Sequence, residues 1–182
     1  IGNISIAKMH TPASSSASTR LDEAEKASLK ARDLTLQLLT FAKGGAPIKQ
    51  TASITELLRD TAGFVLHGSK AQCVFDLEPH LWPGEVDEGQ ISQVIDNLVI
   101  NAVQAMPKGG RILVSSHNVT LEANSGLHLP AGKYVQVCVQ DEGTGIPPEI
   151  LPKIFDPYFT TKASGSGLGL ATSYSIVRNH NG

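Results

Sequence analysis

The sequence predicts an α+β fold, in which a two-layer α/β sandwich is preceded by an antiparallel helical hairpin. Residues 20–43 repeat apolar side chains every three or four positions, which is typical of an amphipathic helix. Residues 71–77, 111–119 and 133–140 alternate apolar and polar side chains, which is typical of half-buried strands. Helical and strand patterns mix without a regular strand–helix–strand repeat, which favours helices on one face of the sheet over a doubly wound parallel sheet.

The composition limits the class of protein. The chain has 182 residues, 41% of them hydrophobic and 18% charged, as in ordinary globular domains. Its formal net charge of −2 predicts no general attraction for nucleic acid or for an anionic membrane. No apolar run approaches the roughly 20 residues that span a bilayer. We therefore expect a cytoplasmic location and no membrane contact by these residues, although a parent protein could be membrane-anchored elsewhere.

The first 45 residues are expected to form a helical hairpin. Residues 1–10 show a short apolar helical pattern, residues 11–19 are a polar loop, and the long helix 20–43 ends at Gly44–Gly45. A hairpin with one apolar stripe has to bury it, commonly against a second copy. The sequence therefore predicts a homodimer through this hairpin.

Residues 46–182 are expected to form a second domain. Its predicted elements follow in order: a linker at 46–50, a helix at 54–66 capped by Ser53, a strand at 71–77, a turn region at 79–84, a helix at 87–106, strands at 111–119 and 133–140, and a helix at 168–179. Cys73 and Cys138 lie in the strand-like runs and are expected in the core. Leu98, Val99 and Ile100 are also expected to serve the core.

Three polar motifs stand out, and each has an ordinary structural explanation beside a functional one. Asn97 and Asn101 share a helix face. They could form a solvated polar edge or a buried hydrogen-bonded pair, or the Asn101 amide oxygen could be a ligand for Mg²⁺. Asp141 precedes Gly143 and Gly145, as a simple turn or to accept a hydrogen bond from an exocyclic amino group such as that of adenine. GSGLGL precedes the last helix, and could be a flexible loop that ends in a helix cap or a phosphate site at a helix N-terminus.

In this order and at these intervals, QVIDNLVINAVQAM, DEGTGIP and GSGLGL resemble the histidine kinase branch of the superfamily that includes gyrase, the mismatch-repair ATPases and the heat-shock chaperone ATPases. The resemblance extends from about residue 51 to the end. IFDPYFTTK resembles that family's phenylalanine segment, with Phe155 and Phe159 as its aromatic residues. The resemblance implies a Bergerat-type ATP-binding fold, ATP and Mg²⁺ as cofactors, and transfer of the γ-phosphoryl group to a histidine for relay to the receiver domain of a response regulator.

The resemblance also implies a role for individual residues. Asp141 would select adenine, Asn101 would hold Mg²⁺, and Asn97 would lie beside the phosphates, so that Asn97, Asn101 and Lys162 form the catalytic set. A lid at about 147–166 would cover the nucleotide. The remaining expected nucleotide contacts are Gly143, Gly145, Ile146, Phe155, Thr161, Lys162, Gly165, Gly167, Leu168, Gly169 and Leu170.

One position separates the branches of the family. ATP-hydrolysing relatives carry a glutamate as general base one turn before the metal-binding asparagine, whereas this chain has Asn97, whose amide has no useful basicity. Asp96 points about 100° away on a regular helix and is not expected to replace that base. The sequence therefore favours phosphotransfer, with a regulatory nucleotide-binding module, a serine kinase or an ATPase on the same fold as alternatives.

The sequence also departs from the family pattern. Many relatives have a basic residue three positions after the metal asparagine, and here that residue is Gln104, which gives Lys162 more weight. The hairpin resembles the part of a dimerisation hairpin after the phospho-acceptor motif, and none of the six histidines has that motif's context. We therefore expect these residues to bind nucleotide without autophosphorylation. The closing C-terminal strands of the family are also expected to be missing.

Overall fold

The computed structural model describes residues 2–12, 15–43, 46–123, 126, 129–162 and 165–182. They form two compact units, Ile1–Lys43 and Gly44–Gly182. Each unit is considered by itself below. In the described ranges, no helix combines the length and apolar character needed to cross a membrane.

The first unit is a hairpin of helices α1 (Gly2–Met9) and α2 (Ser16–Lys43). The Lys8 ammonium lies 2.7 Å from Asp22 and 2.6 Å from Glu25, and the Ser5 hydroxyl donates to Glu25, so the two helices run antiparallel. Hydrogen bonds to these two carboxylates raise the pKa of Lys8, and the bonds from Lys8 and Ser5 lower the pKa of Glu25. Helix α2 begins four residues before the expected start because the Ser15 hydroxyl accepts the Ser18 N–H and caps it.

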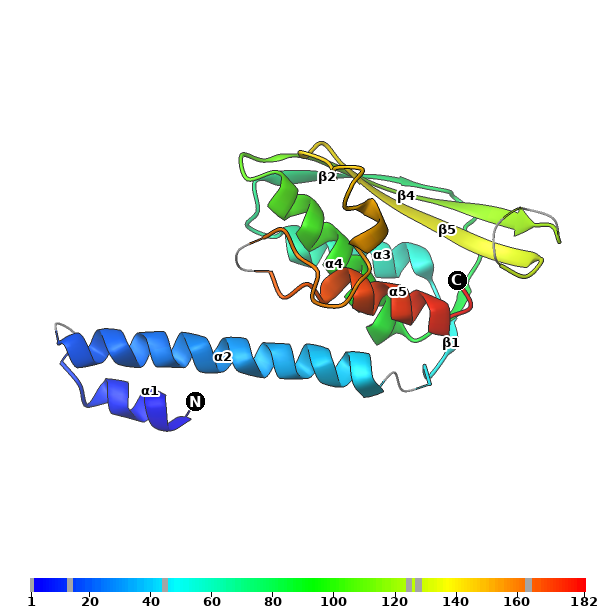
Figure 1. Cartoon of the computed structure of the whole chain (residues 1–182). Coiled ribbons are helices and arrows are strands. Elements are labelled where there is room, and N and C mark those ends of the chain that lie inside the picture. Colours follow the sequence, from blue (N-terminus) through cyan, green and yellow to red (C-terminus); the bar gives the residue numbers. More distant parts are fainter. Residues whose placement is uncertain (1, 13–14, 44–45, 124–125, 127–128, 163–164) are drawn as a thin grey trace. The chain divides into compact units, whose positions relative to one another are not determined.

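The second unit is built on a three-stranded sheet in the order β2 (Ala71–Leu77), β4 (Gly110–Leu121) and β5 (Gly132–Asp141). Strands β2 and β4 are parallel, with Ala71 opposite Gly110, and β4 and β5 are antiparallel, with Ile112 opposite Asp141 (Figure 1). The long β4–β5 pair confirms the hairpin-like arrangement predicted for these segments. Its register places Asp141 beside the beginning of β4.

Two short strands were not expected. β1 (Gln50–Ala52) and β3 (Gly84–Val86) pair antiparallel in segments that the sequence indicated as a linker and a turn region. The Thr51 hydroxyl donates to the Glu85 carboxylate across this pair. Each strand has three residues, too few for an alternating pattern to be recognised.

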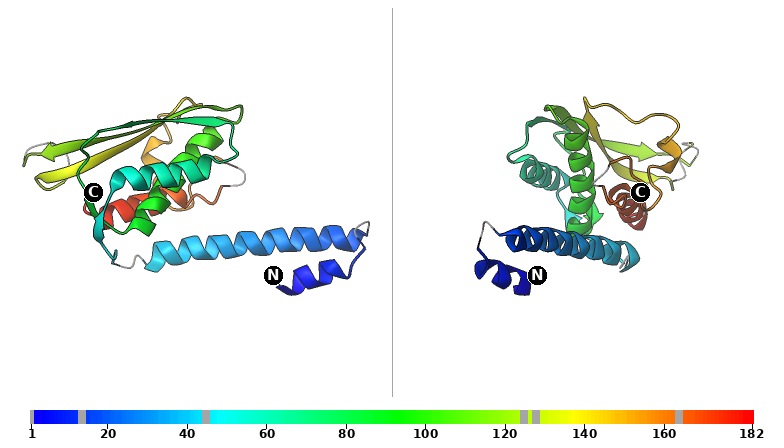
Figure 2. Two further views of the ribbon diagram at one scale, coloured as in Figure 1. Left: turned by 180° about the vertical axis from the view of Figure 1, so that it is seen from behind. Right: turned by 60° about the vertical axis from the view of Figure 1, so that its left-hand side comes forward.

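Three helices, α3 (Ile54–Leu66), α4 (Glu88–Ala105) and α5 (Gly169–Asn179), lie together on one side of the sheet (Figures 1 and 2). Ser53 and Asp87 cap α3 and α4 by accepting the N–H groups of Glu56 and Gln90. The helices and the sheet share one hydrophobic core, which is formed by the buried residues Ile54, Leu58, Ala62, Ile95, Val99, Ala102, Met106, Ile112 and Val114. This arrangement confirms the predicted α+β sandwich.

Two of the expected core residues lie outside the core. Cys138 is exposed because the other face of β5 carries no helix, whereas Cys73 is partly buried and packs against the core. Ile100 is 42% exposed because the buried stripe of α4 follows the positions of Ile95, Val99 and Ala102. Alternation alone did not distinguish the covered face of the sheet from the open one.

Candidate functional site

One stripe of α4 organises the candidate site. Asn97, Asn101 and Ala105 follow one another at intervals of four residues, so they lie on successive turns of the same face. Each meets a different segment: the beginning of α5, the lid, and the loop after β5. The rise of about 1.5 Å per residue spreads these three meeting points over about 12 Å. Residues up to 76 positions from Asn97 in the sequence are thereby brought to one helix face.

Asn97 joins α4 to α5. Its side-chain amide donates to the Gly169 carbonyl at 3.1 Å and to the Ser173 hydroxyl at 3.2 Å. A Cβ atom on Gly169 would lie 3.3 Å from Asn97 Oδ1, so the first turn of α5 packs closely against this side chain. The neighbouring Asp96 is partly buried, and this burial raises its pKa.

Asn101 meets the lid through Lys162. The Lys162 ammonium donates to Asn101 Oδ1 at 2.9 Å and to Gln104 Oε1 at 2.6 Å. Partial burial lowers the pKa of Lys162, because desolvation disfavours its charged form. Two amide oxygens one turn apart on α4 therefore already accept a cationic group at this point.

The loop after β5 reaches α4 through Gly143. A Cβ atom there would lie 2.6 Å from the Ala105 Cβ, so only glycine permits this approach. Asp141 Oδ1 accepts the Gly143 N–H at 2.8 Å, and the Asp141 side chain is exposed. Gly145 has a φ of +69°, and Ile146 is 47% exposed beside it. The carboxylate and the exposed Ile146 together suit a flat polar ligand with an apolar face.

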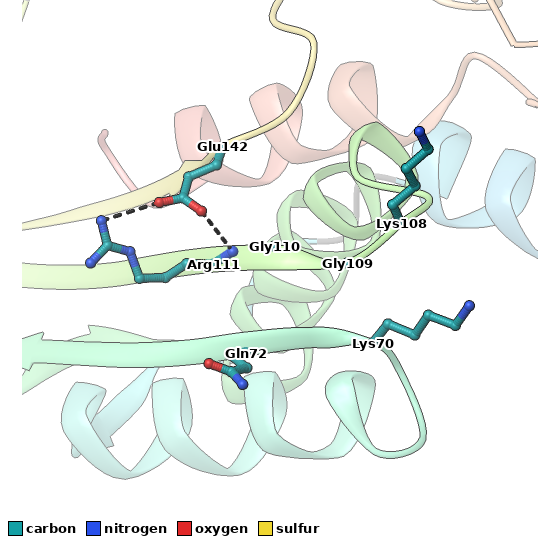
Figure 3. Close-up of a pocket in the computed structure, with 7 residues that line it drawn as sticks. All are labelled: Lys70, Gln72, Lys108, Gly109, Gly110, Arg111 and Glu142. Atoms are coloured by element: carbon teal, nitrogen blue, oxygen red, sulfur yellow. Dashed lines mark hydrogen bonds and ion pairs between the residues drawn. The ribbon is translucent and has the colours of Figure 1, made fainter.

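Glu142 anchors this loop to the sheet. Its carboxylate accepts the Arg111 backbone N–H at 3.1 Å and pairs with the Arg111 guanidinium at 3.2 Å. Figure 3 shows the pair across the ends of β4 and β5, while Lys70 and Lys108 extend away from it. Arg111 and Glu142 line a cavity of about 330 Å³, together with Lys70, Gln72, Lys108, Gly109 and Gly110. This cavity contains neither Asn97 nor Asn101, so it is separate from the α4 stripe.

The lid is anchored at two places. The Phe155 ring lies 5.4 Å from the Tyr174 ring of α5, and both side chains are about half exposed. The Tyr158 N–H donates to the Gly167 carbonyl at 2.9 Å, which connects the middle of the lid to the residue just after its C-terminal end. Between these anchors, Thr161 is exposed and Phe159 is partly buried. The short helix η1 (Leu151–Lys153) lies in the first part of this segment.

The glycine-rich segment leads into α5 without a side-chain cap on the helix. Leu168 occupies the N-cap position and is 1% exposed, so its side chain belongs to the core. Its N–H lies 3.4 Å from the Ser166 hydroxyl, and the Thr172 N–H donates to its carbonyl at 2.8 Å. The N–H groups of Gly169 and Leu170 follow in the first turn, where a helix N-terminus favours an anion. Gly165 and Gly167 border this turn on the lid side.

Several residues of the site escaped the sequence interpretation. Ser173 had no signal because its contact with Asn97 depends on the packing of α5 on α4. Arg111 and Glu142 are 31 residues apart and meet only through the β4–β5 register. Gln104 stands where many relatives have a basic residue, and the sequence did not predict its contact with Lys162.

The donor set bears on the kind of metal that could bind. Over the described ranges, no group of three or more His, Cys, Asp or Glu side chains could hold a metal ion. A site formed by three such side chains is therefore not present in these ranges. Mg²⁺ differs, because it keeps several waters and binds through few protein groups and substrate phosphates. The Asn101 oxygen, which accepts an ammonium here, fits that requirement.

Comparison with known proteins is consistent with this geometry. The family described as "Histidine kinase-, DNA gyrase B-, and HSP90-like ATPase" matches residues 86–182, more than half of the chain. The sensor kinase CckA of Brucella abortus is 38% identical over 160 residues, which cover 84% of this chain and 17% of that protein. The signal transduction histidine-protein kinase AtoS of Escherichia coli is 35% identical over 149 residues, 80% of this chain and 23% of that protein. The chain thus spans less than a quarter of these two relatives.

Solved structures show the same fold. The catalytic domain of histidine kinase ThkA superposes with a TM-score of 0.59 at 29% identity, covering 72% of this chain and 81% of that one. Full-length ShkA in complex with AMPPNP superposes with a TM-score of 0.68 at 24% identity, covering 93% of this chain and 34% of that one. This chain belongs to the histidine kinase-, DNA gyrase B- and HSP90-like ATPase family, and within that family it is an ATP-binding catalytic core of the sensor histidine kinase type.

Proposed function

We propose that the second unit binds ATP with Mg²⁺ along the α4 stripe and donates the γ-phosphoryl group to a histidine on the dimerisation hairpin of the whole protein. The observation that carries this proposal is the convergence of three segments on Asn97, Asn101 and Ala105. The adenine end lies at Asp141 and the phosphate end at the beginning of α5. Asn101, between these ends, would hold Mg²⁺, which would neutralise phosphate charge during transfer.

Different residues of the chain have different roles in binding the nucleotide. The Asp141 carboxylate accepts a hydrogen bond from the exocyclic amino group of adenine, and Gly143, Gly145 and Ile146 border the base. The Lys162 ammonium and the N–H groups of Gly169 and Leu170 face the phosphates, while Phe155 anchors the lid on α5. The acceptor histidine nitrogen bonds to the γ-phosphorus as the bond to the β,γ-bridging oxygen breaks, and ADP leaves with that electron pair.

Asn97 supports transfer to a side chain over transfer to water. Its amide N–H groups are engaged by Gly169 and Ser173, and an amide oxygen cannot remove a proton from water at neutral pH. Positioning and charge neutralisation are therefore the principal contributions that this site makes. The phosphohistidine would then be the substrate of the receiver domain of a response regulator, and the hairpin of the first unit would form the homodimer.

The test is a calorimetric titration of a Mg²⁺-bound, non-hydrolysable ATP analogue into the whole chain. Asp141→Asn and Asn101→Ala should each raise the dissociation constant about 10- to 100-fold, as expected for one lost charge-assisted hydrogen bond or metal contact. Asp76→Asn, on the exposed side of β2, and Asn179→Ala, at the exposed end of α5, are matched controls. Equal affinity in all four variants would refute the assigned site.

Phosphotransfer needs its own test. A dimerisation helix with its acceptor histidine, supplied as part of the whole protein, should become labelled from γ-³²P-ATP in an acid-labile form. Release of inorganic phosphate without labelled histidine would identify an ATPase and overturn the proposed reaction. Binding of nucleotide with neither product would identify a regulatory module.

A further inference from the structure

Helix α4 carries no positive charge of its own at the candidate site. None of its 18 residues is lysine, arginine or histidine. The cation beside Asn101 comes from the lid instead, because the Lys162 ammonium reaches Asn101 Oδ1 at 2.9 Å. Among the described residues, the cation that contacts this face of α4 therefore comes from the lid.

Gln104 shares this ammonium with Asn101. Gln104 Oε1 lies 2.6 Å from Lys162 Nζ, a shorter distance than the one to Asn101. Gln104 and Asn101 are three residues apart, so their amide oxygens lie on one face of α4. An ammonium has three donors and can serve both oxygens at once. The lid lysine is thus bound at two points to the same helix.

The two contacts have different consequences when metal binds. Mg²⁺ takes its oxygen ligands at about 2.1 Å, and a lysine ammonium at the same oxygen would meet strong repulsion from the divalent ion. Lys162 has to leave Asn101 Oδ1 for that reason. Gln104 lies about one turn further along the helix, so its oxygen can keep the ammonium close while Asn101 changes partner.

We propose that Gln104 is a positioning residue that binds the lid lysine, Lys162, to α4 before nucleotide arrives and retains it when Mg²⁺ takes Asn101. The second half of this inference rests on the proposed function, and the first half depends only on the contacts of the chain itself. Gln104 thereby provides from the lid the charge that α4 lacks. It acts through Lys162 and does not itself contact the nucleotide.

Limited proteolysis by trypsin measures the first half directly. Trypsin cleaves after lysine only when that side chain is free to enter the protease, so a bound Lys162 is protected. Lys153, in η1 of the same lid segment and exposed, serves as the internal reference. The measured quantity is the ratio of cleavage after Lys162 to cleavage after Lys153, followed by mass spectrometry without nucleotide or metal.

Three variants of the whole chain test the role of the Gln104 oxygen. Gln104→Met keeps the length but removes the acceptor, and should raise the ratio about three- to tenfold, as expected for a lost hydrogen bond to a charged group at an exposed position. Gln104→Glu keeps an acceptor and adds a negative charge, so its ratio should equal or fall below that of the unaltered chain. Gln136→Met, on the exposed face of β5, should leave the ratio unchanged.

An unchanged ratio in Gln104→Met, or equal increases in Gln104→Met and Gln104→Glu, would overturn the inference. A merely structural role for Gln104 would raise cleavage after Lys162 and Lys153 alike, and this outcome would also contradict it. The result is independent of nucleotide binding. If the ATP analogue fails to bind the unaltered chain, the proposed function fails while the cleavage comparison still decides whether Gln104 positions the lid.

Discussion

Substitution of Gly167 by alanine tests how the lid is joined to α5. Gly167 has a φ of +69°, and its carbonyl accepts the Tyr158 N–H at 2.9 Å. A Cβ atom at Gly167 would lie 2.6 Å from the Tyr158 carbonyl oxygen and 2.7 Å from the Tyr158 Cα. These are backbone atoms, so no side-chain rotation can relieve the overlap. Gly167→Ala therefore has to displace the chain itself.

The structure sets the size of the effect. The left-handed conformation costs an alanine about 1–2 kcal/mol, and forced overpacking typically costs about 1–3 kcal/mol more. The chain can relieve this strain by moving the segment before α5 away from Tyr158, at the expense of the Asn97–Gly169 contact. If about 2 kcal/mol of this cost falls on the nucleotide-bound state, the dissociation constant rises about 30-fold.

The assay is calorimetric titration with the Mg²⁺-bound ATP analogue, combined with chemical unfolding. Gly68→Ala is the matched control, because Gly68 has a φ of +79° and nothing within 4 Å of the added Cβ. It should lower the free energy of unfolding by about 1–2 kcal/mol without changing nucleotide affinity. Unchanged affinity in Gly167→Ala, or an equal loss of affinity in Gly68→Ala, would refute the reasoning.

Three further predictions concern stability and reactivity. The Ser116 hydroxyl is fully buried without a hydrogen-bond partner among the described residues, so Ser116→Ala should raise the free energy of unfolding by about 1 kcal/mol. A lower free energy of unfolding in chemical denaturation would show that the hydroxyl has a partner and would contradict this prediction. Desolvation raises the pKa of Cys73 and keeps its thiol protonated, so at mildly alkaline pH a thiol reagent should modify the exposed Cys138 first; mass spectrometry that finds Cys73 modified first would contradict the burial pattern. Arg111→Met should lower the free energy of unfolding by less than about 1 kcal/mol, because Arg111 and Glu142 are both more than half exposed, and the difference should fade in high salt; a larger or salt-independent loss would indicate a role beyond the ion pair.

The elements that sequence reasoning found best are those with long periodic patterns or clear caps. Ser53 marks the beginning of α3, and the alternation of residues 71–77 marks β2 with the bounds that the structure shows. The beginning of α2 was placed too late because the polar residues 16–19 resemble a loop, while the Ser15 cap that makes them helical is a local geometric feature. The short strands β1 and β3 are stabilised by pairing with each other, and neither has a sequence pattern that would predict it separately.

The candidate site was predicted in parts. The residue types at Asn97, Asn101, Asp141 and the glycine-rich segment indicated a nucleotide site, and the structure places all of these segments beside α4 or at its end. The assigned roles in adenine and Mg²⁺ binding stay predictions. The individual contacts could not be predicted, because they depend on how the lid and α5 pack against a helix up to about 70 residues earlier in the chain.

The sequence by itself determined the fold class, the family resemblance and the residue types of the candidate site, because periodicity, caps and motif spacing are local properties of the chain. Tertiary structure alone decided that Cys138 and Ile100 face outward, that Glu142 pairs with Arg111, and that Gln104 holds Lys162 beside Asn101. These facts depend on which face of an element is covered and on which distant atoms meet, and the packing of the whole domain sets both.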